Sequence, residues 1–422
     1  MRAAPAFSLI LAAQYALPLL ALPFLARRLD GADFGLLLYM LNMAAIFSIF
    51  VDWGFSVSVA RDIALSRDAP EKIRAVAAAA MGGKIILTAA CLPVVLAFSP
   101  ILPHAVDAPG LYWICAAYGL MQGLNPTCFF QGLGHGMPRM ALAEAGSGLL
   151  ALILTFACVK EDSPAWFYPL FLLLCKSAAY ALQTHRAFFL CGSPRFSPRR
   201  IIKALDAGLP FMLNRLSSLC YTQGGIVILG ITLPPAQVGI FVVADKIARA
   251  LINLSNPFMQ ALFPEMCAEN RQNSRQGARM LRWIFLSICL GMLTAALLLC
   301  WQAPRVTALA LGAENPGLDR ASGVLRAFCL MIPLHACNIV LGTQTLIARG
   351  FERPMTAVLA LAGLAALPGY YLLSAYCGLD GVAFMPALVE GGIFLGLAGC
   401  VLRLCPEALF PAHRPAAPGG DG

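Results

Sequence analysis

The sequence predicts an all-α, polytopic membrane protein with about twelve transmembrane helices, arranged as two lobes of six. Composition is the first reason: of the 422 residues, 59% are hydrophobic and 12% are charged, about half the charged share of a soluble domain. The second is a set of apolar runs such as 7–26 and 283–301, each long enough to cross ~30 Å of hydrocarbon as a helix. The third is a charge asymmetry between alternate connections.

Hydropathy divides the chain into apolar segments with short connections. In order, the expected spans are residues 7–26, 35–57, 75–99, 111–130, 140–159, 165–184, 205–230, 238–262, 283–302, 321–348, 355–375 and 380–402. The first is predicted to be an uncleaved span, because only Arg2 precedes it and the apolar run continues to Arg27 and Arg28. The Pro/Gly-rich tail is predicted to be disordered.

Positive charges give the orientation. Lys and Arg are concentrated in the connections of one side, whereas the other side contains Arg27, Arg28, Lys160, Arg305 and Arg320. Because cytoplasmic connections carry the excess of Lys and Arg, both termini are predicted to be cytoplasmic. The formal net charge of +9 follows from this topology and gives no reason to expect a nucleic acid partner.

The basic connection 185–204 divides the spans six and six. The pattern L-x-x-A-x-x-G occurs at 29–35 and again at 233–239, before the second span of each half, which favours an internal duplication of the kind found in transporters. The predicted domains are a first lobe at 1–190, a basic cytoplasmic linker at 191–204, a second lobe at 205–402 and a tail at 403–422.

Ionisable groups inside spans are costly and normally face the bundle interior or a water-filled cavity. Such groups here include Asp52, Lys84, Glu144, Lys176, Arg215, Asp245, Lys246, Arg249 and Glu390. In span 8, Asp245, Arg249, Asn253, Asn256 and Gln260 share one helical face. Asp245 and Arg249 could simply pair with each other, but the rest of the polar stripe favours a cavity wall.

Two polar pairs, Gln122 with Asn125 and His335 with Asn338, fit a cavity wall and helix–helix hydrogen bonding equally well. Lys84 follows two glycines, yet the remaining positions of a phosphate-binding loop are missing. The scattered cysteines show no metal-binding spacing. No catalytic or metal site is therefore predicted, and the chain is not expected to be an enzyme.

Four segments together resemble the bacterial polysaccharide flippases. They are "DGADFGLL" (30–37), "DWGFSVSVARDIA" (52–64), "NPTCFFQGL" (125–133) and "ADKIARALINLSNPFMQALFPEM" (244–266). These flippases are the O-antigen and lipid-linked oligosaccharide translocases of the multidrug/oligosaccharidyl-lipid/polysaccharide exporter superfamily. Trp53, Cys128 and Asp245 depart from the residues that are commonest in the family.

The resemblance implies a MATE-like, two-lobe transporter of the bacterial inner membrane. Its cargo would be an oligosaccharide on a polyprenyl diphosphate, flipped by alternating access. No cofactor is implied beyond a coupling ion, H⁺ or Na⁺. Membrane lipids, a polysaccharide polymerase and a chain-length regulator are the implied partners.

The candidate residues fall into two groups. The substrate-binding candidates are Arg215, Lys246, Arg249, Asn253, Asn256, Lys84, Gln122 and Asn125, of which the cations could meet the diphosphate by charge-assisted hydrogen bonds. The gate or coupling candidates are Asp52, Arg61, Asp62, Asp245 and Glu390. Arg61 and Asp62 are interpreted as a clamp at the membrane interface, and Asp52 as holding a gate or a helix contact.

Two other functions stay open. A cation-coupled multidrug exporter would share the architecture, but such exporters favour acidic binding groups, whereas spans 7 and 8 contain Arg215, Lys246 and Arg249 against Asp245. A membrane enzyme such as a polymerase or ligase would need a sizeable external loop, and the external connections predicted here are short.

Overall fold

The computed structural model describes residues 3–66, 69–134, 136–161, 163–191, 196–255, 258–259 and 275–406. These residues form helices and no strand, so the predicted all-α fold is confirmed. Asn256 and Gln260, like most of the tail, lie outside the described residues.

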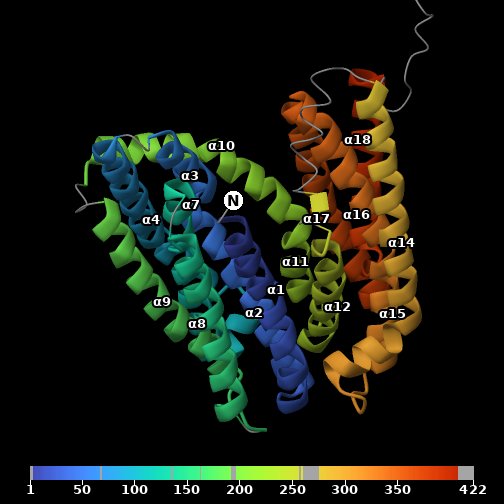
Figure 1. The fold of residues 1–422 in the computed structure, drawn as a ribbon. Helices are drawn as coiled ribbons and strands as arrows, with labels where there is room; N and C mark the ends of the chain where they lie inside the picture. Colours follow the sequence, from blue (N-terminus) through green and yellow to red (C-terminus); the bar gives the residue numbers. More distant parts are fainter. Residues whose placement is uncertain are drawn as a thin grey trace, which may run out of the picture.

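The first half of the chain forms one bundle. Its helices are α1 (Ala3–Arg28), α2 (Gly31–Asp52), α3 (Phe55–Leu65), α4 (Pro70–Phe98), α5 (Pro103–Asp107), α6 (Pro109–Gly123), α7 (Thr127–Leu133), α8 (Met137–Cys158) and α9 (Phe167–Cys191). Figure 1 shows them together at the left of the molecule.

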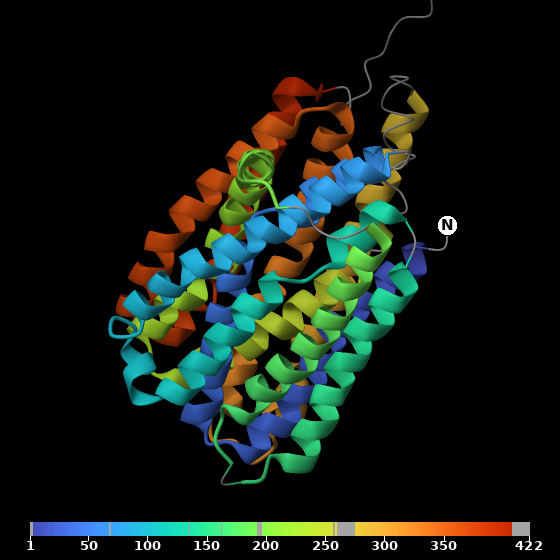
Figure 2. The ribbon, with the colours of Figure 1, turned by 90° about the vertical axis from the view of Figure 1, so that its left-hand side faces the viewer.

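The second half forms the other bundle. It comprises α10 (Pro198–Thr222), α11 (Gly224–Thr232), α12 (Pro235–Asn253), α14 (Arg275–Leu311), α15 (Leu318–Cys329), α16 (Met331–Ile339), the π-helix η1 (Val340–Leu346), the short η2 (Ile347–Arg349), α17 (Glu352–Val382) and α18 (Met385–Leu404). Figure 2 views the molecule from the side of the first bundle, whose helices lie in front of those of the second. Among the described residues, seven helical stretches are long and apolar enough to cross a membrane.

Several expected spans are broken into two or more helices, which hydropathy did not predict. Span 2 divides into α2 and α3 because Trp53 and Gly54 adopt left-handed backbone conformations, with φ of 49° and 78°. The conformation and the close packing both suit glycine at residue 54: a Cβ there would lie 2.7 Å from the Cβ of Phe211. Spans 4, 7 and 10 are also divided, without left-handed residues at the described breaks, into α6 and α7, α10 and α11, and α15, α16 and η1.

The two glycines of the repeated sequence pattern meet where α2 crosses α12. A Cβ on Gly35 would fall 1.8 Å from the carbonyl oxygen of Pro235, and a Cβ on Gly239 would fall 2.8 Å from the Cα of Gly35. Small residues let helix backbones approach this closely. The repeat therefore forms a contact between the two halves of the chain.

Helix α10 bridges the two bundles, as Figure 1 also shows. In its first half, Leu205 accepts a hydrogen bond of 3.0 Å from the indole Nε1 of Trp53 in the first bundle. In its second half, the carbonyl oxygen of Ser217 would lie 2.8 Å from a Cβ on Gly363 of α17. Helix α10 thus contacts both bundles.

Candidate functional site

Two cavities of about 440 Å³ each lie near the junction of the bundles, and Pro18 of α1 lines both. The first-lobe cavity is lined by residues that include Asp52, Tyr118, Gln122, Glu144, Tyr168 and Arg215. The second-lobe cavity is lined by residues that include Gln223, Asp245, Lys246, Arg249, Asn253 and His335. Most of the candidate residues thus line one of two neighbouring cavities.

Asp52 is the last residue of α2, and its side chain belongs to a buried ion pair. Its Oδ1 accepts a hydrogen bond of 3.1 Å from Lys84 of α4, and the hydroxyl of Ser56 donates to it at 2.7 Å. Lys84 Nζ also donates to the carbonyl oxygens of Gly123 and Asn125, each at 2.9 Å. The side chain of Lys84 is only 1% exposed and does not line the described cavities. Lys84 therefore joins α2, α4 and the break between α6 and α7.

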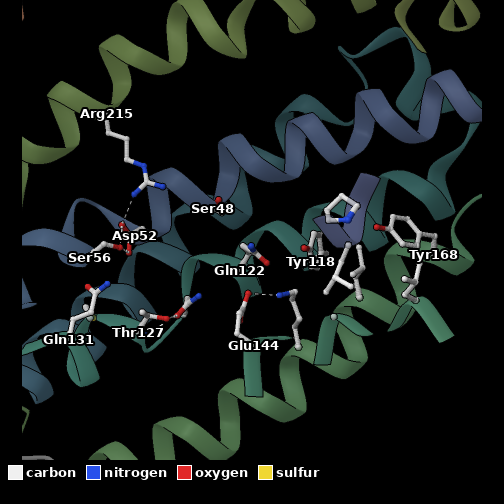
Figure 3. A pocket seen from close by; sticks show the side chains of 18 residues that line it. Ser48, Asp52, Ser56, Tyr118, Gln122, Thr127, Gln131, Glu144, Tyr168 and Arg215 are labelled. Carbon is white, nitrogen blue, oxygen red and sulfur yellow. Dashed lines mark hydrogen bonds and ion pairs between the residues drawn. The ribbon is translucent and has the colours of Figure 1, made fainter. Parts of the chain in front are cut away.

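Arg215 approaches the same carboxylate from α10. Its Nη1 lies 3.4 Å from Asp52 Oδ2, at the long limit of a hydrogen bond, and half of its side chain is exposed. Figure 3 shows this guanidinium at one end of the first-lobe cavity. Because Lys84 and Ser56 already satisfy Asp52, Arg215 can turn to another anion without leaving an unpaired buried charge.

A second buried ion pair crosses the first-lobe cavity wall. Lys176 of α9 donates to Oε1 of Glu144 on α8, and both side chains are at most 10% exposed. The amide of Asn125 donates to the hydroxyl of Tyr180 at 3.1 Å, and its oxygen accepts from Thr127. Gln122 lines the same cavity, and its Oε1 is buried without a hydrogen-bond partner in the described structure.

The polar stripe of α12 lines the second-lobe cavity. Arg249 Nε donates to both carboxylate oxygens of Asp245, at 2.7 and 2.9 Å. The pairing and the cavity wall, which were alternatives for these residues, therefore coexist. Lys246 forms no ion pair or hydrogen bond with the described residues. The lining of this cavity among the described residues thus contains two cations, Lys246 and Arg249, against one acid, Asp245.

Glu390 of α18 joins α16 in a compact hydrogen-bonded group. Its Oε1 lies 2.8 Å from His335 Nδ1, and its Oε2 accepts a bond of 2.7 Å from Asn338. Glu390 is buried, whereas His335 reaches the second-lobe cavity. The polar pair of span 10 thus connects a buried carboxylate to the cavity surface.

Arg61 and Asp62 pair with each other near the end of α3. Both Nε and Nη2 of Arg61 donate to Asp62 Oδ1 at 3.1 Å, and the guanidinium lies 5.7 Å from the ring centre of Phe211 on α10. This pair is exposed and lies away from both cavities described above.

Tyr118, Tyr168, Glu144 and Lys176 line the first-lobe cavity, although none was a candidate site residue. The two charged residues could have been selected as site candidates from the sequence, because ionisable groups are rare in spans. The tyrosines could not, because aromatic residues are common in spans.

Known proteins that resemble this chain in sequence include a family and two relatives. The family described as "Polysaccharide biosynthesis protein" matches residues 4–268. The "Putative O-antigen transporter" of Escherichia coli (strain K12) is 25% identical over 359 residues, covering 84% of this chain and 85% of the relative. The protein of the same name from Shigella dysenteriae is 24% identical over 397 residues, covering 90% and 95%.

Solved structures share the fold. The lipid II flippase MurJ in its inward closed conformation superimposes with a TM-score of 0.71 at 14% identity, covering 94% of this chain and 87% of that one. An inward-facing MATE family multidrug transporter of the MOP superfamily gives a TM-score of 0.69 at 15% identity, covering 93% and 99%. Because the family match covers more than half of the chain, the chain belongs to the polysaccharide biosynthesis protein family.

Proposed function

We propose that the protein flips oligosaccharides linked to polyprenyl diphosphate across the bacterial inner membrane, by alternating access of its two lobes. Family membership, the O-antigen transporters among its relatives and the MurJ-like and MATE-like fold support a transporter. The observation that carries the proposal is the wall of the second-lobe cavity, where the cations Lys246 and Arg249 outnumber the one acid, Asp245, in the described lining. An anionic diphosphate would balance this excess positive charge.

The remaining cations take different parts in this proposal. Arg215 is half exposed and only weakly held by Asp52, so it can also meet the diphosphate. Arg249 is held in the cavity wall by its ion pair with Asp245. Asn253 lines the same wall. Lys84 is a positioning residue, because its ammonium group already donates hydrogen bonds to Asp52 and two carbonyl oxygens.

Ion coupling remains part of the proposal. Glu390 and Asp245 are the acidic candidates for binding H⁺ or Na⁺, and the contact of Glu390 with His335 links the first of them to the cavity. A multidrug exporter of the same fold remains the alternative function, but it leaves the excess of cations on the second-lobe cavity wall without a role.

The test is a charge swap in the native host. Arg215, Lys246 and Arg249 are replaced singly by Ala and by Glu, and Lys246→Arg serves as the charge-preserving control. We expect the Glu variants to reduce surface polysaccharide and to accumulate lipid-linked repeat units on the cytoplasmic face, at unchanged protein level. Normal display in all Glu variants would contradict the diphosphate assignment. Normal flipping with failed polymerisation would instead contradict transport and favour an enzyme.

A further inference from the structure

We propose that the first-lobe cavity is a glycan site, which receives uncharged, hydroxyl-rich sugar rings of the cargo while the diphosphate lies toward Arg215. The proposal rests on the flippase function proposed above and deepens it, because it assigns the sugar part of the substrate to particular side chains. Figure 3 shows the arrangement: Arg215 and Asp52 lie toward one end, and Tyr118 and Tyr168 toward the other.

Charge is the first argument. Glu144 is neutralised by Lys176, and Asp52 by Lys84 with help from Arg215. The inner part of the cavity therefore presents little net charge to a ligand. A neutral polar group can enter it without the desolvation cost that an isolated ion would meet.

Hydrogen-bonding capacity is the second argument. Gln122 Oε1 is buried without a partner in the described structure, which is costly unless a ligand or water bonds to it. The hydroxyls of Tyr118 and Tyr168 make no hydrogen bond within the described residues, and both tyrosines line the cavity. Sugar hydroxyls both donate and accept, so they can serve an amide oxygen and phenol hydroxyls at once.

Shape is the third argument. The volume of about 440 Å³ lies within the usual range for small-molecule sites. Tyrosine combines an apolar ring face with a polar tip, which suits a sugar ring, because its C–H groups and its hydroxyls point in different directions. Leu17, Leu152 and Leu172 complete the apolar part of the wall.

The test compares two defined lipids in detergent: polyprenyl diphosphate alone, and the same lipid carrying N-acetylglucosamine. Affinity for each is measured with the purified full-length protein. Gln122→Leu and Tyr168→Phe remove one polar group each from the cavity. Gln183→Leu and Tyr39→Phe are matched controls, because those side chains also have buried, unpartnered oxygens but do not line the described cavities. A melting curve for each variant shows that the protein is folded.

We expect the sugar-bearing lipid to bind more tightly to the wild type, and Gln122→Leu and Tyr168→Phe each to lose about threefold to tenfold of that affinity. The controls should keep it, and binding of the bare diphosphate should be unchanged in all four variants. Equal affinity of the wild type for both lipids, or equal losses in the controls, overturns the glycan site. Failure of both lipids to bind would instead contradict the proposed function itself.

Discussion

Replacing Lys84 with Met should destabilise the protein strongly, because it leaves a buried carboxylate without its main partner. Lys84 Nζ holds three acceptors at 2.9 to 3.1 Å: Asp52 Oδ1 and the carbonyl oxygens of Gly123 and Asn125. Methionine has a similar length and fills the space, but it supplies no proton. The change therefore removes the charge and the three hydrogen bonds with little loss of packing.

The magnitude follows from the burial of the pair. Removing one partner of a buried ion pair costs about 3–5 kcal/mol, and Lys84 and Asp52 are only 1% and 10% exposed. The double variant Asp52→Asn with Lys84→Met has no buried charge left at this site. It should recover part of the loss, with an interaction energy of about 1–3 kcal/mol.

Thermal unfolding of the purified protein in detergent measures these effects. We expect Lys84→Met to lower the melting temperature by at least about 5 °C and the double variant to lie between it and the wild type. Arg215→Gln is the control, because Arg215 is half exposed and exposed pairs contribute at most about 1 kcal/mol. A wild-type melting temperature for Lys84→Met, or a double variant less stable than the single one, would refute the reasoning.

Three further predictions use the same assay. Lys176→Met should lower the stability by about 3–5 kcal/mol, because it leaves the buried Glu144 without its ion-pair partner. Adding Glu144→Gln should restore part of the lost stability, and no restoration would contradict the pairing. Gly35→Ala should destabilise the crossing of α2 with α12, where its Cβ would overlap a carbonyl oxygen, whereas Gly146→Ala meets nothing within 4 Å; equal melting temperatures for both would contradict the crossing. Glu390→Leu should cost about 1–3 kcal/mol by removing the carboxylate that His335 and Asn338 contact, and an unchanged melting temperature would contradict that hydrogen-bonded group.

The membrane-spanning character of the chain could be predicted from the sequence, because hydropathy is a local property. Helical periodicity likewise placed Asp245 and Arg249 within reach of each other, and the structure forms that pair. The breaks within spans could not be predicted in this way. The left-handed turn at Trp53 and Gly54, for example, depends on α10 packing against it from a distant part of the chain.

The partners of the buried charged residues also could not be predicted from the sequence. Lys84 and Asp52 are 32 residues apart, as are Lys176 and Glu144, and nothing local indicates which helices face each other. As a result, Lys84 was expected on a cavity wall, whereas it is enclosed between helices. Tyr168 illustrates the opposite case: its residue type is unremarkable in a span, and only the fold brings it to the first-lobe cavity.

Flipping in vesicles tests most directly whether a cationic passage carries the diphosphate of a lipid-linked oligosaccharide. The purified protein is reconstituted with a fluorescent polyprenyl-diphosphate oligosaccharide, and loss of access to an external glycosidase is followed over time. We predict rapid transfer by the wild type and by Lys246→Arg, and a rate at least about tenfold lower for Lys246→Glu, as expected for losing a charge-assisted bond. Transfer by Lys246→Glu at the wild-type rate, or by the wild type no faster than in protein-free vesicles, would contradict the account.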